Sequence, residues 1–143
     1  MNPEDTVLET IRENLHLAYP VATREDVSEN SNILLSRLLF IINSEDSNPY
    51  ILEHPGYSLY SLQSIYHTLS DDPDRYMGWH RLITLFRVLE EGSESVKISK
   101  CPDGVFGSEI APLITDKPIM DDTILKKILD DMYNQEHVDL RRS

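Results

Sequence analysis

The chain has 143 residues, of which 25 are acidic and 13 are basic, so its formal net charge is −12. The first 96 residues contain 16 acidic side chains and six arginines, and no lysine precedes Lys97. This charge argues against nucleic acid and anionic membranes as partners, because both attract proteins through neutralisation of their negative charge. The length and the 40% hydrophobic content suit one globular domain over residues 1–143.

The sequence carries no sign of secretion or of a membrane span. Cys101 is the single cysteine, which excludes an internal disulfide and makes a reducing compartment the natural setting. The first residues lack the basic and apolar regions of a signal peptide. The longest apolar run, residues 33–42, is too short to cross a bilayer. We therefore expect a cytoplasmic or otherwise intracellular protein without a classical secretion signal.

Two marked helix starts open the chain. Asn2 is suited to be an N-cap and Pro3 to be the first helical residue, and apolar residues then recur at helical spacing until residues 19–20. A second capped start lies at residues 23–26, and the next helix begins there or one turn later. Its second half, residues 33–42, is apolar almost all round, which predicts a central helix covered on several sides. A buried strand is the competing interpretation of so short a run.

Two more helices are expected in the middle of the chain. Ser58 is a suitable cap for a third helix over residues 58–70, which carries apolar side chains at helical spacing. Asp72 is the expected cap of a fourth helix, with Pro73 at its first position. This helix should run to about Glu91, because a glycine follows directly.

The last third of the sequence changes character. Alternating side chains around a turn predict a small β-hairpin at residues 96–106. A short helix should follow Ser108, limited by Pro112, and paired aspartates at 121–122 should open a final amphipathic helix. The tail, residues 137–143, should be frayed. Together these elements predict a mainly all-α fold, a compact bundle of five to six helices with that hairpin attached.

The sequence lacks the common motifs of catalysis. It contains no Gly-rich phosphate loop, no GxSxG and no HExxH. We therefore predict a non-enzymatic protein with no cofactor and with no catalytic, cofactor-binding or metal-binding residues. A small metal- or thiol-dependent enzyme is the second alternative. It would use either Cys101 beside two lysines or a metal site of His67, His80, Asp71 and Asp72.

Aromatic and apolar residues in and just after the loop at 44–57 are candidates for contact with a partner. Tyrosine is favoured at interfaces because it offers a large contact area at little cost in conformational entropy. These candidates are Tyr50, Ile51, Leu52, Tyr57 and Tyr60. The alternative is that they fold back and cover the core. With the charge, they predict an acidic helical protein-interaction module, an adaptor, chaperone or inhibitor of the immunity-protein type, whose protein partner would be basic.

One segment resembles part of a known family. Residues 78–86, Gly-Trp-His-Arg-Leu-Ile-Thr-Leu-Phe, are similar to the Asn-Trp-Gly-Arg segment that begins a core helix in Bcl-2-like proteins. Trp79 and Arg81 match, whereas Gly78 stands in the place of the asparagine and His80 in the place of the glycine. The resemblance covers nine residues, and we assign no family from it. It implies an alternative function, a groove that binds an amphipathic helix, with Arg81 pairing with an aspartate of that ligand.

Overall fold

The computed structural model describes residues 3–47, 55–69, 72, 75–91, 111–115 and 118–142. These residues form the helices α1 (Pro3–Ala18), α2 (Arg24–Ser47), α4 (Pro55–Ser58), α5 (Leu62–His67), α6 (Met77–Glu91), α7 (Pro112–Thr115) and α8 (Asp122–Arg142). The described residues are mostly helical and contain no strand, which confirms the predicted all-α fold. The hairpin predicted at 96–106 lies outside the described residues.

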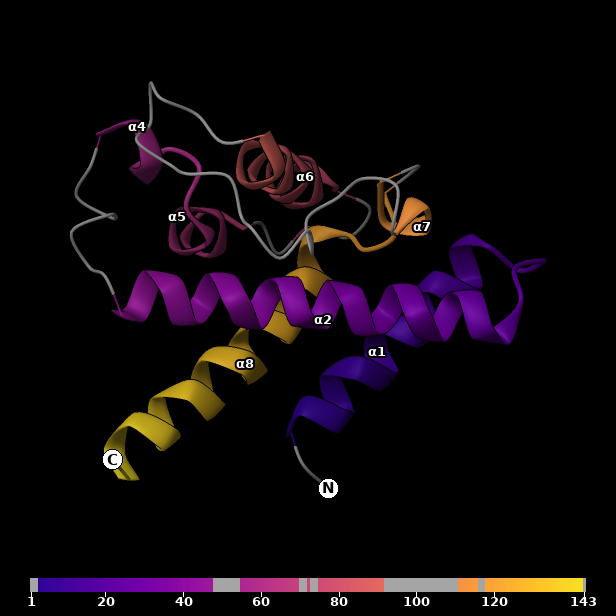
Figure 1. Cartoon of the computed structure of the whole chain (residues 1–143), viewed down its shortest axis with the longest axis horizontal. Coiled ribbons are helices and arrows are strands. Elements are labelled where there is room, and N and C mark those ends of the chain that lie inside the picture. The colour runs from indigo at the N-terminus through magenta and orange to yellow at the C-terminus, as the bar shows by residue number, and fades with distance from the viewer. Residues whose placement is uncertain are drawn as a thin grey trace.

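The longest helix, α2, runs through the middle of the molecule (Figure 1). The shorter helices α4, α5 and α7 lie with α6 on one side of it, and α1 and most of α8 lie on the other. α1 packs against both α2 and α8, and α6 packs against α5 and the start of α8. The apolar run at 33–42 is therefore part of a central helix, as predicted, and the strand interpretation is wrong.

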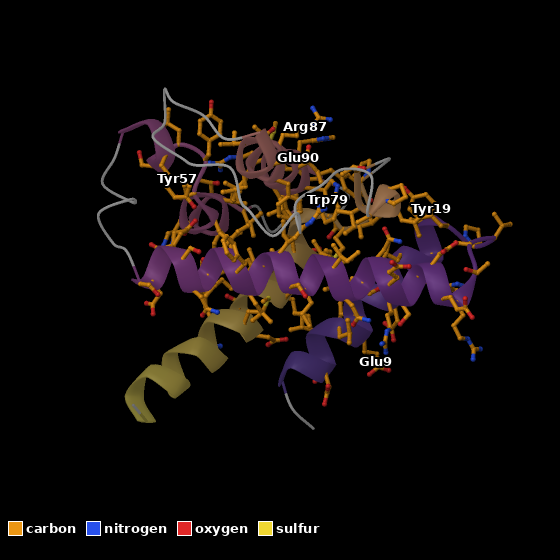
Figure 2. The ribbon with its side chains drawn as sticks, in the orientation of Figure 1. Glu9, Tyr19, Tyr57, Trp79, Arg87 and Glu90 are labelled. Atoms are coloured by element: carbon orange, nitrogen blue, oxygen red, sulfur yellow. The ribbon has the colours of Figure 1, made fainter. Side chains whose placement is uncertain are left out.

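The side chains that face α2 form one apolar core. Trp79 of α6 is 1% exposed and lies between α6 and α2 (Figure 2). Each long helix contributes residues at helical spacing, as the amphipathic pattern requires. Fully buried examples are Ile11 and Leu15 of α1, Leu34 and Leu38 of α2, Leu82 and Leu85 of α6, and Leu125 and Leu129 of α8.

Three helix starts follow from local sequence, as predicted. α1 begins at Pro3, and its last residue, Ala18, precedes the predicted stop. Thr23 caps α2, because its hydroxyl accepts a hydrogen bond of 3.0 Å from the backbone N–H of Asp26. In the same way Asp121 caps α8, since its carboxylate accepts a 3.0 Å bond from the N–H of Ile124.

Other helix boundaries differ from the prediction. Ser61 is the cap of α5, not Ser58, which ends the preceding helical turn α4. α6 begins at Met77 and not near residue 73. The carbonyl of Arg75, which precedes α6, accepts a 2.6 Å bond from the N–H of Asp122 in α8 and so is not engaged by α6. Pro112 begins α7, whereas residues 108–110, where the short helix was predicted to start, lie outside the described residues. The single domain and the frayed tail stay predictions, although α8 extends to Arg142.

Candidate functional site

A buried carboxylate of α2 holds the start of α5. The side chain of Glu45 is 2% exposed, and one oxygen accepts bonds from the N–H of Leu62 at 2.7 Å and the hydroxyl of Tyr57 at 2.6 Å. Its other oxygen accepts a 3.2 Å bond from the N–H of Gln63. These amides belong to the first turn of α5, whose N–H groups have no partner inside the helix. Glu45 therefore acts as a second cap beside Ser61.

The surroundings of Glu45 oppose its ionisation. Burial raises the pKa of this carboxyl above its ordinary value, and the three hydrogen bonds it accepts offset part of the increase. The same burial, with the nearby Glu45 charge, raises the pKa values of Tyr57 and Tyr133. Both phenols therefore stay protonated at neutral pH, and Tyr57 serves as a hydrogen-bond donor.

Two other buried polar side chains play the same part at α6 and α7. The carboxylate of Asp122, the first residue of α8, accepts a 2.9 Å bond from the N–H of Gly78 in the first turn of α6. The amide oxygen of Asn30 in α2 accepts a 3.1 Å bond from the N–H of Leu113 in α7. Glu45, Asn30 and Asp122 thus each bind the N-terminus of a helix other than their own, and we call them the cross-helix caps.

The sequence pattern places Asp122 at the start of its own helix, and it does not predict that Asn30 and Glu45 cap other helices. A signal for Glu45 exists in the sequence. It continues the helical spacing of Leu38, Ile41 and Ile42, so it lies on the buried face of α2. A carboxylate on such a face needs hydrogen-bond donors, because burial of an unsatisfied charge is costly.

The central helix also buries a cation. Arg37 is fully buried, and its guanidinium carbon lies 5.0 Å from the centroid of the Phe86 ring. Burial lowers the pKa of Arg37 to about 10, and the nearby Glu90 carboxylate raises it in part. The guanidinium remains charged at neutral pH and joins α2 to α6 through a cation–π contact.

A pair of tyrosines joins α5 to α8. The rings of Tyr66 and Tyr133 contact each other at a tilt of 34° with centroids 4.9 Å apart, and the hydroxyl of Tyr66 donates a hydrogen bond to the Asp130 carboxylate. This bond is the main reason that the pKa of Tyr66 rises to about 12. The contact fixes the end of α5 against the middle of α8.

The predicted partner-binding residues fall in different settings. Tyr50, Ile51 and Leu52 lie outside the described residues. Tyr57 is buried and bonded to Glu45, so it contacts the core in this structure. Tyr60 is half-buried and packs against the core from the turn between α4 and α5.

Arg81 lies on α6 and binds the neighbouring segment of its own chain. Its guanidinium donates bonds to the Ser64 hydroxyl at 3.0 Å, to the Leu59 carbonyl at 3.3 Å and to the Thr68 hydroxyl. Three donors of a rigid, planar group are thereby directed at α5 and the turn before it. Arg81 fixes α6 to α5.

Two residues linked to Arg81 expose large apolar side chains. Leu59, whose carbonyl accepts from Arg81, is 70% exposed. Met77, one helical turn before Arg81, is 56% exposed. With the half-buried Tyr60, they form a mixed apolar and cationic surface that we call the Arg81 patch. It combines residue types that carry much of the binding energy at protein interfaces.

The residues proposed for metal or thiol chemistry do not gather in the described parts. Among the residues that the structure describes, no group of three or more His, Cys, Asp and Glu side chains is arranged to hold a metal ion. His67 and His80 are both exposed, and Asp71 and Cys101 lie outside the described residues. Likewise, none of the described helices combines the length and apolar character that a bilayer span requires.

Comparisons of the chain with protein-family models, curated proteins and solved structures gave no significant match.

Proposed function

We propose that this protein is a non-enzymatic helical interaction module that binds a protein partner through the apolar side chains of the Arg81 patch, while the acidic residues elsewhere in the chain attract a partner of basic overall charge. The observation that carries the proposal is the exposure of two large apolar side chains, that of Leu59, whose carbonyl binds Arg81, and that of Met77, one helical turn before Arg81. An apolar side chain loses unfavourable contact with water when a partner covers it. Arg81 fixes α6 to the turn that carries Leu59, so this surface loses little further freedom on binding.

The charge of the chain supports a basic partner. A net charge of −12 accelerates the encounter with a cationic protein and disfavours nucleic acid. The single cysteine supports an intracellular setting, in which thiols stay reduced. Adaptor, chaperone and inhibitor are all roles that such a module can serve.

The groove-binding alternative has less support. It requires Arg81 to pair with an aspartate of a bound helix. In the structure three of its donors already bind oxygens of the α4–α5 turn and α5. An incoming aspartate would have to replace these bonds.

Affinity capture with matched surface variants tests the proposal. The wild type and a Leu59→Ser/Met77→Ser double variant are immobilised and exposed to lysate of the native source at low and high salt. We expect the wild type to retain a basic protein at low salt. High salt should reduce this retention, because added ions screen exposed charges. The double variant should lose this protein.

A second double variant, Leu17→Ser/Val21→Ser, serves as the control. Leu17 and Val21 are at least as exposed but lie at the far end of α1 and in the turn after it. Its capture should equal that of the wild type. Equal capture by the Leu59→Ser/Met77→Ser variant, or capture that salt leaves unchanged, would contradict the proposal.

A further inference from the structure

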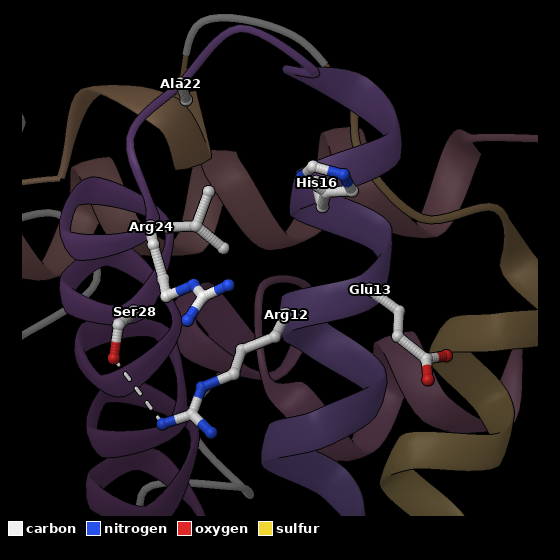
Figure 3. Close-up of a pocket in the computed structure, with 7 residues that line it drawn as sticks. Arg12, Glu13, His16, Ala22, Arg24 and Ser28 are labelled. Atoms are coloured by element: carbon white, nitrogen blue, oxygen red, sulfur yellow. Dashed lines mark hydrogen bonds between the residues drawn. The ribbon is translucent and has the colours of Figure 1, made fainter.

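A cleft lies between α1 and α2, near the turn that joins them. It has a volume of about 580 Å³, and its lining includes Arg12 and His16 of α1, and Arg24 and Ser28 of α2. Arg12 and His16 are one helical turn apart, so they share a face of α1. Figure 3 shows the guanidinium groups of Arg12 and Arg24 reaching into the same space between the two helices.

The guanidinium groups of Arg12 and Arg24 share this space without a carboxylate partner among the described residues. Neither Arg12 nor Arg24 takes part in an ion pair with another residue of the described ranges. Arg12 donates a long hydrogen bond of 3.5 Å to the hydroxyl of Ser28. Glu13 also lines the cleft, but its carboxylate points away from both guanidinium groups (Figure 3).

The cleft gathers basic residues although the chain as a whole is acidic. Acidic residues outnumber basic ones by almost two to one, yet two arginines and a histidine meet in one cleft. Like charges at close range repel each other, and an anion between them removes the repulsion. Guanidinium groups fit carboxylate and phosphate oxygens well, because their N–H donors form a planar fork.

The apolar part of the lining indicates that the rest of the ligand is apolar. Ala22 and the buried Val27 give the cleft an apolar wall. The volume lies in the range of about 300–1,000 Å³ that is usual for small-molecule sites, well above the need of a bare inorganic ion. A ligand that fills the cleft would place an apolar body on this wall and its anionic end between the arginines.

We propose that this cleft binds an oxyanion, a phosphate or a carboxylate, carried on a small apolar group. The site is separate from the Arg81 patch and does not depend on the function proposed for that patch. Arg12 and Arg24 bind the oxyanion, His16 and Ser28 contribute further donors, and Ala22 and Val27 contact the apolar group.

An NMR titration of the full chain with phenyl phosphate tests the site. At low salt we expect saturable shifts of the backbone amide signals confined to residues 12–16 and 22–28. Arg12→Gln and Arg24→Gln should each weaken binding about tenfold or more, because each removes charge-assisted hydrogen bonds. Both arginines are exposed, so these variants should keep the helical content of the wild type. Arg87→Gln, at an exposed arginine of α6, should bind like the wild type.

Further probes separate the parts of the proposal. Inorganic phosphate, which has no apolar group, and benzyl alcohol, which has no charge, should both bind more weakly than phenyl phosphate. A capped phosphotyrosine pentapeptide distinguishes the sources. Binding at least as tight as that of phenyl phosphate would indicate a group presented by a protein chain, and exclusion of the peptide would indicate a free small ligand.

Three results would overturn the oxyanion site. They are the absence of saturable shifts with phenyl phosphate, equal binding of benzyl alcohol, and an equal loss of affinity in Arg87→Gln.

Discussion

At the scale of single residues, the buried polar groups stabilise the fold through directed hydrogen bonds. Glu45 is the clearest case, because one carboxylate satisfies two backbone amides and a phenol in a region that water does not reach. Removal of a buried acceptor costs more than the bond itself contributed, since its donors are left without partners.

We expect Glu45→Ala to lower the free energy of unfolding by about 2–4 kcal/mol, because three buried or half-buried donors lose their acceptor. Glu29→Ala, at an exposed position of the same helix, should change stability by less than about 0.5 kcal/mol. Urea denaturation of both variants measures the two effects. A similar loss in both would show that Glu45 has no special role.

The raised pKa of Glu45 gives stability a dependence on pH. The folded protein holds this proton more tightly than the unfolded chain, so the group stabilises the fold as pH is lowered from neutral. The effect is complete below the ordinary pKa of glutamate and is lost as pH rises through the raised pKa.

The uncharged Glu45→Gln variant isolates this effect. The difference in the free energy of unfolding between the wild type and Glu45→Gln should shift in favour of the wild type as pH is lowered from neutral. Denaturation series of both proteins over the same pH values provide the measurement. A difference that does not change with pH would show that the pKa of Glu45 is not raised by folding.

At the scale of elements, the helices differ in what determines their starts. α1, α2 and α8 begin beside local signals, at Pro3, Thr23 and Asp121, and the sequence predicted these starts correctly. The start of α6 depends on Asp122, 44 residues away from Gly78, and no local pattern contains that information.

The same limit applies to α5 and to the candidate site. Ser58 and Ser61 are both plausible caps by residue type, and the position of Glu45 decides between them. Arg81 was identified, but its bonds to α5 could not be predicted, because they depend on how two helices pack. The cleft between α1 and α2 was missed for the same reason, since Arg12 and Arg24 become neighbours only after folding.

Close contact at the start of α6 leads to a further prediction. A β-carbon at Gly78 would lie 3.1 Å from the Asp122 carboxylate and 3.2 Å from a methyl group of Leu125, and would clash with the side chain of Leu69. Gly78→Ala should therefore destabilise the protein by about 1–3 kcal/mol. This loss should appear although alanine favours a helix interior over glycine by about 1 kcal/mol.

His80→Ala is the matched control, because His80 is exposed on the same helix. Thermal unfolding of the two variants should show a lower midpoint for Gly78→Ala and no comparable fall for His80→Ala. An unchanged or higher midpoint for Gly78→Ala would mean that α6 and α8 separate easily at this point.

At the scale of the whole molecule, four of the six arginines in the first 96 residues have surroundings that suit a planar cation. Arg37 stacks on a core ring, Arg81 binds α5, and Arg12 and Arg24 line the cleft. These settings require a planar, permanently charged group, which lysine does not provide. The absence of lysine before Lys97 is consistent with arginines that are needed for their planar shape, because lysine would serve equally well for solubility.

The cross-helix caps should also make unfolding cooperative. Trp79 is the single tryptophan and is buried between α6 and α2, so its fluorescence reports on packing. We expect its transition in urea to coincide with the loss of far-UV circular dichroism, as two-state unfolding requires. Fluorescence that changes well before the helical signal would indicate separate folding units and contradict the predicted single domain.

The cross-helix caps also determine how the sequence can diverge. Exposed positions such as Glu29 are free of such contacts with the described residues. Asn30, Glu45 and Asp122, in contrast, accept hydrogen bonds from backbone amides that are 83, 17 and 44 residues away, respectively. If an apolar residue replaced Glu45, a second substitution would have to supply a new hydrogen-bond acceptor for the amides at the start of α5. Polar residues at these three spacings, set within otherwise apolar helical faces, are therefore a signature by which distant relatives of this chain can be recognised.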